Sequence, residues 1–501
     1  MLFNSYGFIF LFLPLTLALF FAAARVSEAA AKLTLIAASV LFYGWWNPVY
    51  VPLLALLMLF TYVVGQRLSE RPSRALLGFG VAVLLGALGY FKYAGFLVAN
   101  IDALTGANWA VGTIVLPLAI SFFTFQKIAY LVDSHRGLTR DTGFLDYALF
   151  VVFFPQLIAG PIVHWKEILP QFRLPETFRP HAENIAVGTT IFAIGLFKKA
   201  VLADGIAVHA TPVFALADGG ASPDLLTAWR GALAYTLQLY FDFSGYSDMA
   251  IGAARLFGIV LPLNFASPYK ARNIAEFWRR WHMTLSRFLR DYLYIALGGN
   301  RQGAVRRYAN LFTTMLLGGL WHGAGWTFVL WGALHGAFLV VHRLWQRLKL
   351  PLPATAAWAL TFFAVVFAWV PFRAETLAGA GQIVAGMVGF NGVALPAAAG
   401  AAIGPLRAAA EGVGVAFTLG GGSAFVAGWL WIFGLLALAL AAPNTQELLA
   451  SHRPGLGFEA RACVGRLHWL PSRRWALATA VLATAGTLAL ARASEFLYFQ
   501  F

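Results

Sequence analysis

Two histidines lie inside an almost wholly apolar stretch of this chain. The segment GGLWHGAGWTFVLWGALHG covers residues 318–336 and contains His322 and His335. An imidazole removed from water must find polar partners, and ionisable groups at membrane depth usually face a cavity or the interior of a helix bundle. Desolvation favours the neutral ring, which is the form that a general base needs. Both rings are therefore candidates for proton-transfer chemistry.

The neighbours of the two rings distinguish them. Four small residues surround His322, namely Gly318, Gly319, Gly323 and Gly325. Small residues let another backbone or a substrate approach the ring, so we expect His322 to carry the chemistry. His335 lies on a different side of an ideal helix. We interpret it as a neutral ring that is hydrogen-bonded to a helix carbonyl and holds two helices together.

A second group of polar residues interrupts the apolar segment LYFDFSGYSDMAIGAARLFG, residues 239–258. It consists of Asp242, Ser244, Ser247 and Asp248. The two aspartates do not share a helical face, and one of them is expected to pair with Arg255. Such a pair would hold helices together, although Asp242 and Ser247 are also candidates to line a substrate tunnel. A nucleophilic serine is disfavoured, because the strand–turn–helix setting of an esterase serine is absent.

The segment 267–310 is rich in arginine, with aromatic residues at helical spacing. This pattern predicts a basic amphipathic helix at the membrane surface. Its arginines would hold the phosphates of a donor substrate or anchor the chain to anionic lipid. Arg279, Arg280 and Asn300 are the donor-binding candidates. His282, between Trp281 and Met283, is unremarkable when taken alone.

The elements that must position these residues are membrane helices. Of the 501 residues, 60% are hydrophobic and only 11% are charged, with a mean hydropathy of +0.72. This composition predicts an all-α polytopic membrane protein. Apolar segments near the spanning length of about 20 residues recur throughout. They lie at 5–24, 31–47, 49–65, 75–97, 112–132, 144–160, 184–206, 226–256, 309–345, 355–372, 424–443 and 475–493.

Four regions depart from simple spans. Segments 226–256 and 309–345 exceed one crossing, so each is expected to contain a span plus a re-entrant or tilted piece. Three prolines and a central Gly-Pro predict a broken, re-entrant segment at 155–172. The small, glycine-rich residues 391–423 predict a long loop or short interfacial helices on the non-cytoplasmic side.

Loop charges indicate the orientation. Basic residues follow the first span and recur in QRLSERPSR and DSHRGLTRD, whereas WWNPVY and NIDALTGANW between them contain no Lys or Arg. Because basic loops stay in the cytoplasm, the N-terminus is expected outside it. The net charge of +15 is interpreted in the same way, and no soluble basic domain suggests a nucleic-acid partner.

The single cysteine, Cys463, excludes an internal disulfide framework and a cysteine-based metal site. We interpret it as an inert small residue. The first apolar run lacks a basic leading region and is longer than a signal peptide's core, so it is expected to be a retained helix. The final residues SEFLYFQF are taken as native, since Phe496 stands where a protease tag would carry Asn.

Four motifs resemble the membrane-bound O-acyltransferase family, in particular the bacterial branch typified by the membrane subunit of alginate O-acetylation. They are FFPQLIAGPI, LQLYFDFSGYSDMAIGAARLFG, NFASPYKARNIAEFWRRWHMTLSRFLRDYLYIALGGNR and GGLWHGAGWTFVLWGALHG. The resemblance covers most of the chain as a single domain, residues 1–501, and is densest from 150 to 345. The chain is also similar to the D-alanine exporters of teichoic acid modification. His164 stands where the alginate branch commonly has a basic residue.

The resemblance implies an enzyme, an O-acyltransferase of the bacterial inner membrane. It implies a ring of about 11–13 tilted transmembrane and re-entrant helices around a central tunnel. His322 corresponds to the family's buried catalytic histidine, and His282 to its second active-site position. The implied donor is a cytoplasmic acyl thioester such as acetyl-CoA, with no bound cofactor or metal. The implied acceptor is a hydroxyl serving an exported polysaccharide, directly or through a periplasmic acetyltransferase.

Two mechanisms stay open at this point. Neutral His322 would accept the acceptor's proton, or it would carry the acetyl group transiently. Trp321 and Trp326 are expected to wall a tunnel that excludes water. The acceptor is also open, with alginate, cellulose, peptidoglycan and other polymers as alternatives. A transporter with its site in 155–172 and 226–256, or an assembly subunit of a secretion complex, is the competing interpretation.

Overall fold

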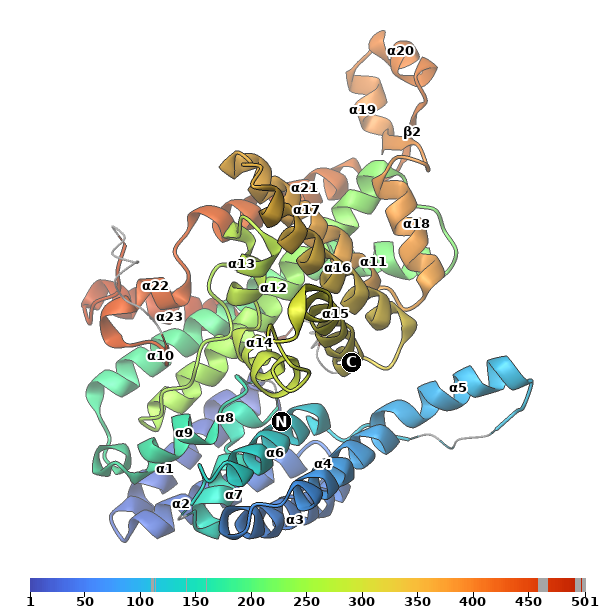
Figure 1. The fold of residues 1–501 in the computed structure, drawn as a ribbon. Coiled ribbons are helices and arrows are strands. Elements are labelled where there is room, and N and C mark those ends of the chain that lie inside the picture. The colour runs from blue at the N-terminus through green and yellow to red at the C-terminus, as the bar shows by residue number, and fades with distance from the viewer. Residues whose placement is uncertain are drawn as a thin grey trace. The chain divides into compact units, whose positions relative to one another are not determined.

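The computed structural model describes residues 1–109, 112, 114–140, 142–158, 160–457, 467–491 and 497. Helices make up nearly all of the regular structure in these ranges, as Figure 1 shows. Within them, six helices are long and apolar enough to cross a membrane, judged by length and composition. They cover 48–70, 74–105, 182–218, 326–348, 354–373 and 422–441. The predicted all-α, polytopic fold is confirmed. Cys463 and most of SEFLYFQF lie outside the described residues.

Contacts divide the chain into two compact units. Unit 1 contains residues 1–197, 244–264 and 445–501, and unit 2 contains residues 198–243 and 265–444. Helix α12 (Leu225–Leu256) is continuous and contributes residues to both units. The expectation of one acyltransferase domain over residues 1–501 stays a prediction.

Unit 1 is built from the N-terminal helices and the last helix of the chain. Its longer helices are α1 (Leu13–Ala24), α2 (Glu28–Gly44), α3 (Val51–Glu70), α4 (Arg74–Leu88), α5 (Ala94–Thr105), α6 (Ile120–His135), α10 (Ala182–Phe197) and α23 (Arg473–Ala489). Its shorter helices are α7 (Phe144–Val152), α8 (Phe154–Leu157), α9 (Trp165–Ile168) and α22 (Thr445–Leu448). Several helices begin at a side-chain cap. The hydroxyls of Ser27 and Ser73, for example, accept backbone N–H groups of α2 and α4.

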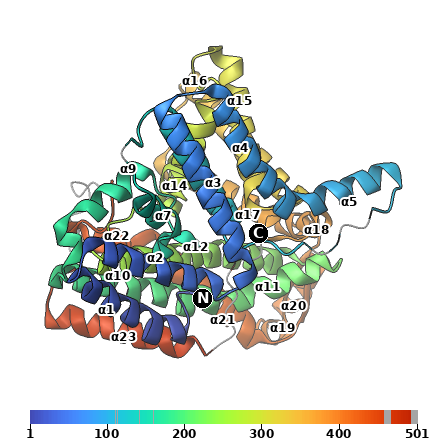
Figure 2. The same ribbon diagram turned by 90° about the horizontal axis from the view of Figure 1, so that it is seen from below.

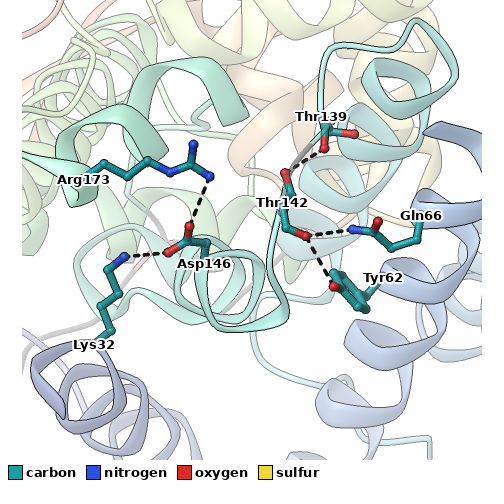
Figure 3. Close-up of polar contacts among 7 residues, drawn as sticks. All are labelled: Lys32, Tyr62, Gln66, Thr139, Thr142, Asp146 and Arg173. Atoms are coloured by element: carbon teal, nitrogen blue, oxygen red, sulfur yellow. Dashed lines mark hydrogen bonds and ion pairs between the residues drawn. The ribbon is translucent and has the colours of Figure 1, made fainter. Parts of the chain in front are cut away.

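Polar contacts at one end of unit 1 hold the loop before α7 and the first turns of α2 and α7 in place (Figure 3). Asp146, in the first turn of α7, pairs with Lys32 of α2 at 2.7 Å and with Arg173 at 3.3 Å. The carbonyl of Thr142 accepts from the side chains of Tyr62 and Gln66 on α3. The hydroxyl of Thr139 lies 3.0 Å from that of Ser69 on α3 and 2.7 Å from that of Ser134 on α6, so the ends of α3 and α6 and the starts of α2 and α7 lie together. The helix ends that carry the predicted cytoplasmic loops lie at this side of unit 1.

Unit 2 contains α11 (Asp204–Asp218), α13 (Ile274–Arg280), α14 (Met283–Phe288), α15 (Gly303–His322), α16 (Trp326–Leu348), α17 (Ala354–Arg373), α18 (Leu377–Met387), α19 (Ala397–Ala402), α20 (Leu406–Gly412) and α21 (Gly422–Ala441). A π-helical turn over Lys198–Ala203 precedes α11. Two short parallel strands, β1 (Val393–Pro396) and β2 (Val415–Leu419), pair Val393 with Val415. Figure 1 shows α19, α20 and β2 beyond one end of α18. The short helices expected in 391–423 are present, and the strand pair was not predicted.

Three of the irregular segments differ in outcome. The broken segment at 155–172 is confirmed, because α8 and α9 are separated by non-helical residues. For 226–256 the re-entrant alternative is wrong, because α12 is one uninterrupted helix of 32 residues, and the tilted alternative stays a prediction. The segment 309–345 is instead two helices, α15 and α16, which Gly323 and Gly325 separate in extended backbone.

The single amphipathic helix predicted for 267–310 is also wrong. The segment forms α13, α14, a π-helical turn and the start of α15, with extended backbone at Trp281 and a left-handed residue at His282. Further along, Gly298 and Gly299 have positive φ and turn the chain before α15. The aromatic residues of α13 are buried within unit 2. The helical spacing of these aromatic residues therefore reflects packing inside unit 2 and not a helix face that lies on the membrane.

Candidate active site

His322 is the last residue of α15, and its side chain lies among aromatic rings. The residue is 6% exposed. Trp331 and Phe372 meet the imidazole edge-on, with ring centres 5.1 and 5.2 Å away and interplanar angles of 84° and 74°. Trp321, its neighbour in sequence, packs at 4.9 Å. These rings give His322 a largely desolvated environment.

Glycines let α15 and α16 meet backbone to backbone beside His322. A β-carbon on Gly319 would lie 3.0 Å from the Cα of Gly332, and one on Gly332 would lie 2.6 Å from the carbonyl oxygen of Met315. Small residues at facing positions permit this close approach. Gly323 faces the ring of Phe328 in the same way. Of the two alternatives expected for these glycines, another part of the chain or a substrate, the first holds for Gly319 and Gly323, because α16 fills that space.

His282 lies between α13 and α14 and is 0% exposed. Its ring centre is 6.2 Å from that of His322 and 4.7 Å from that of Phe243 on α12. Among the described residues, neither ring nitrogen of His282 has a hydrogen-bond partner. Burial lowers the pKa of His282 to about 3, so the ring is neutral near pH 7. The structure thus brings the two predicted histidines together in unit 2.

The backbone at His282 is strained. Its φ of 42° and ψ of 53° are left-handed, a conformation that costs a non-glycine residue about 1–3 kcal/mol. The preceding residue, Trp281, is held firmly, because its indole stacks on Phe277 at 5.6 Å and meets Trp369 at 4.9 Å. Strain of this kind persists where the surroundings over-determine a residue, and such residues concentrate at functional sites.

His335 is buried on α16, one helical turn beyond Trp331. The indole N–H of Trp278 on α13 donates to its Nδ1 at 3.2 Å, which leaves the imidazole proton on Nε2. The ring also contacts Trp331 at 4.8 Å. His335 therefore connects α13 to α16, as expected of a structural ring. The partner is an indole, however, and not the helix carbonyl that the sequence suggested.

The remaining tunnel candidates lie in different places. Trp321 is buried and contacts both His282, at 6.1 Å, and His322. Trp326 begins α16 and is 55% exposed, so its side chain lies outside the buried cluster. Asp242 is buried in unit 2, one residue before Phe243, whereas Ser247 is buried in unit 1.

The ion pair expected between one aspartate and Arg255 is wrong. Asp242 binds Lys199 at 2.5 Å, and Lys199 also binds Asp204 at 2.7 Å. Asp248 accepts from the side chains of Thr445 and Gln446, at 2.6 and 2.9 Å. Arg255 donates instead to the carbonyl of His452 at 3.4 Å. The partners come from distant parts of the chain, which helical spacing cannot reveal.

The donor-binding candidates of the basic segment are not equivalent. Arg280 binds Glu276 at 2.9 Å and donates to the carbonyl of Ala266 at 3.0 Å, so it stabilises the local turn. Arg279 is exposed. Asn300 is also exposed, and its side-chain oxygen accepts from the hydroxyl of Tyr294 at 2.5 Å.

Sequence reasoning missed the walls of the site. Trp331, Phe372 and Phe243 contact the two imidazoles, and none of them was predicted. Trp331 carried a usable signal, since it lies four residues before His335 and therefore on the same helical face. Lys199 carried another, because a lysine inside an apolar segment requires a partner. No described group of three or more His, Cys, Asp or Glu residues is arranged to hold a metal ion.

Comparison with known proteins identifies the family of this chain. The model of the membrane-bound O-acyltransferase family matches residues 134–372. A peptidoglycan O-acetyltransferase from Helicobacter pylori is 45% identical over 430 residues, which cover 79% of this chain and 81% of the relative. The chain belongs to the membrane-bound O-acyltransferase family.

Further relatives carry different acceptor names. A probable alginate O-acetylase, AlgI, from Pseudomonas aeruginosa is 44% identical, covering 78% of this chain and 75% of the relative. A teichoic acid D-alanyltransferase from Bacillus subtilis is 27% identical, covering 46% of this chain and 60% of the relative. The chain is thus a multi-pass membrane acyltransferase, and the cluster around His322 and His282 lies in the segment that the family model matches.

Proposed function

We propose that this enzyme transfers an acetyl group from a thioester donor at the cytoplasmic face to a hydroxyl that serves an exported or cell-wall polysaccharide. The observation that carries the proposal is the buried pair of imidazoles, His322 and His282, 6.2 Å apart. The family supports acyl transfer, and the names of the relatives support acetyl as the group transferred. Acetyl-CoA is the expected donor, with no resident cofactor.

In the proposed reaction, His322 accepts the proton of the acceptor hydroxyl as its oxygen attacks the thioester carbon. The carbon–sulfur bond then breaks, the thiolate leaves, and the imidazolium returns its proton to the sulfur. His282, neutral and without a hydrogen-bond partner among the described residues, can donate an N–H to the oxyanion of the tetrahedral intermediate. The alternative, an acetyl group carried on His322, would show as exchange of label between donor and free thiol without acceptor.

The aromatic walls support transfer over hydrolysis. Trp331, Phe372 and Trp321 surround His322, and the indole of Trp331 stacks on that of Trp369 at 5.8 Å. Excluding water from a reactive thioester prevents its loss and strengthens the electrostatic interactions of the site. Trp326, Asp242, Ser247 and Asn300 stay candidates for substrate contact, and exposed Arg279 stays the candidate for donor phosphates.

The orientation belongs to the same proposal. The enzyme would lie in the bacterial inner membrane with its N-terminus outside the cytoplasm. The polar contacts at one end of unit 1 (Figure 3) support a common side for its basic loops. By their composition, residues 391–423 would face the non-cytoplasmic side, where a periplasmic acetyltransferase or the polymer itself receives the acetyl group.

The test uses membrane vesicles that contain the full chain and an acceptor polymer. Inside-out vesicles supplied with labelled acetyl-CoA should form base-labile acetyl esters, whereas sealed right-side-out vesicles should form few. His322→Ala should lower ester formation by about 10²–10⁴-fold. His342→Ala, on the same unit but outside the cluster, is the matched control. Wild-type ester levels in a folded His322→Ala enzyme would overturn the assignment.

The acceptor is tested in the same assay. Relatives of nearly equal identity are named for peptidoglycan and for alginate, so both polymers are offered in parallel with cellulose. Mass spectrometry of each polymer reports which one gains acetyl groups. A transporter, by contrast, would move substrate across vesicles that contain no acetyl donor, and an assembly subunit would leave acetylation intact in every histidine variant.

A further inference from the structure

A groove of about 850 Å³ lies between α10 and α23 of unit 1. Figures 1 and 2 show these two helices side by side. Small and apolar residues form most of its walls, with threonines midway along the helices and the charged Arg473 at one end. The walls are formed by Ile185, Ala186, Thr189, Ala476, Ala480 and Ala483. The groove belongs to neither the imidazole cluster nor unit 2.

The two helices pack closely along part of their length. Near their C-terminal ends, a β-carbon on Gly486 would lie 2.9 Å from the side chain of Leu196. Midway along, the hydroxyls of Thr190 and Thr479 lie 3.3 Å apart. The lining residues run along α10 from Ala182 to Thr190 and along α23 from Arg473 to Ala483, so the groove follows more than half of each helix. The space is long and apolar, which suits an alkyl chain.

The mouth of the groove is polar and carries positive charge. Arg473 lines it at the start of α23, together with Ser472, His181 and two indoles, Trp469 and Trp475. In the described part of the chain, the guanidinium of Arg473 has no hydrogen-bond or ion-pair partner. α10 and α23 both begin here, so backbone N–H groups of two helix N-termini add partial positive charge.

In the described part of the chain, an acidic residue next in sequence to this mouth is already paired. Glu183, in the first turn of α10, binds His452 at 2.9 Å. The carbonyl of the same His452 accepts from Arg255. Among the described residues that line the groove, the formal charge is therefore that of Arg473.

We propose that this groove binds one anionic phospholipid, with an acyl chain between α10 and α23 and the phosphate at Arg473. A volume of 850 Å³ falls within the range of about 300–1,000 Å³ typical of small-molecule sites. An apolar channel that ends at an unpaired guanidinium matches an amphiphile with an anionic head. Tryptophans at the mouth match the depth of lipid headgroups.

Two pairs of variants test the site in the purified full chain. Ala480→Phe fills the groove, and Val481→Phe places the same ring on an exposed neighbour outside it. Arg473→Gln removes the charge at the mouth, and Arg474→Gln removes one in the same turn that does not line the groove. Retained lipid is measured by native mass spectrometry after exchange into detergent with added phosphatidylglycerol or phosphatidylcholine.

The wild type and both controls should retain one phosphatidylglycerol in preference to phosphatidylcholine. Arg473→Gln should reduce that preference about tenfold, as loss of a charged contact to phosphate predicts. Ala480→Phe should abolish retention of either lipid, with an unchanged elution volume as the check on folding. Equal retention of the two lipids by the wild type, unchanged retention by folded Ala480→Phe, or a protein occupying the groove in place of lipid would overturn the proposal.

Discussion

Two buried polar regions of unit 2 differ in whether their polar groups have partners. Around Lys199, every charge has a counter-charge, because its ammonium binds Asp204 and Asp242. Around His282, both ring nitrogens lack a hydrogen-bond partner in the described structure, and the backbone is left-handed. The first arrangement stabilises the fold, whereas the second costs free energy of folding. The comparison indicates that the region around His282 is the better candidate for chemistry, because its polar atoms are available to bind a substrate.

The largest effect on stability is expected at the paired region. Lys199→Met leaves the buried Asp242 and the partly buried Asp204 without their cation, which should lower the free energy of unfolding by about 3–5 kcal/mol. Lys198→Met, in the same π-helical turn but less buried, is the matched control. Unfolding by denaturant in detergent measures both. Adding Asp242→Asn to Lys199→Met should restore part of the loss, and an unchanged stability of Lys199→Met would contradict the contrast.

The second effect is a pH dependence at the unpaired region. The pKa of His282 falls from an ordinary 6.5 to about 3 on folding, so the unfolded chain binds more protons between these values. The free energy of unfolding should therefore decrease as pH falls below about 6.5, by up to about 1.4 kcal/mol per pH unit from this ring.

His282→Asn removes that dependence while keeping a side chain that tolerates left-handed backbone. The slope of unfolding free energy between about pH 6 and pH 4 should be smaller in the variant than in the wild type. Denaturant unfolding at several pH values measures the slope, and acetyl transfer should be impaired at every pH. Identical slopes would show that the ring is not buried and neutral in the fold.

The smallest effect concerns the ring that does have a partner. Trp278→Phe removes the N–H that binds His335 but keeps an aromatic ring, so stability should fall by about 1 kcal/mol. Acetyl transfer per folded molecule should change little. Trp358→Phe is the matched control, because it removes an indole bond to the carbonyl of Tyr269 outside the cluster. A large and selective loss of activity in Trp278→Phe would move His335 from a structural to a catalytic role.

Much of the fold was predictable, because membrane helices are encoded locally. Apolar runs of near-spanning length predicted the positions of α3, α17 and α21, and three prolines predicted the broken segment at 155–172. The helical pattern of 267–310 misled, because the left-handed turn at His282 depends on tertiary packing of Trp281 against Phe277 and Trp369. Helix propensity and residue spacing do not reveal such packing.

The site was predictable only in part, for a related reason. An imidazole in an apolar run identified His322 as unusual without any structure. The partner of Asp242 was not accessible in this way, since Lys199 lies 43 residues earlier on another helix. The glycines left two alternatives open, because the same small residue can admit a substrate or a neighbouring helix. Only the position of α16 decides between these uses.

The backbone contact between Gly319 and Gly332 has a consequence for how this enzyme can diversify. Any larger residue at either position would force α15 and α16 apart, so the relative placement of His322 and Trp331 is fixed by main chain. Phe372 on α17 and Phe243 on α12 face the same imidazoles through side chains alone. Substitutions at these two positions would therefore change the space around His322 and His282 without changing how α15 packs against α16.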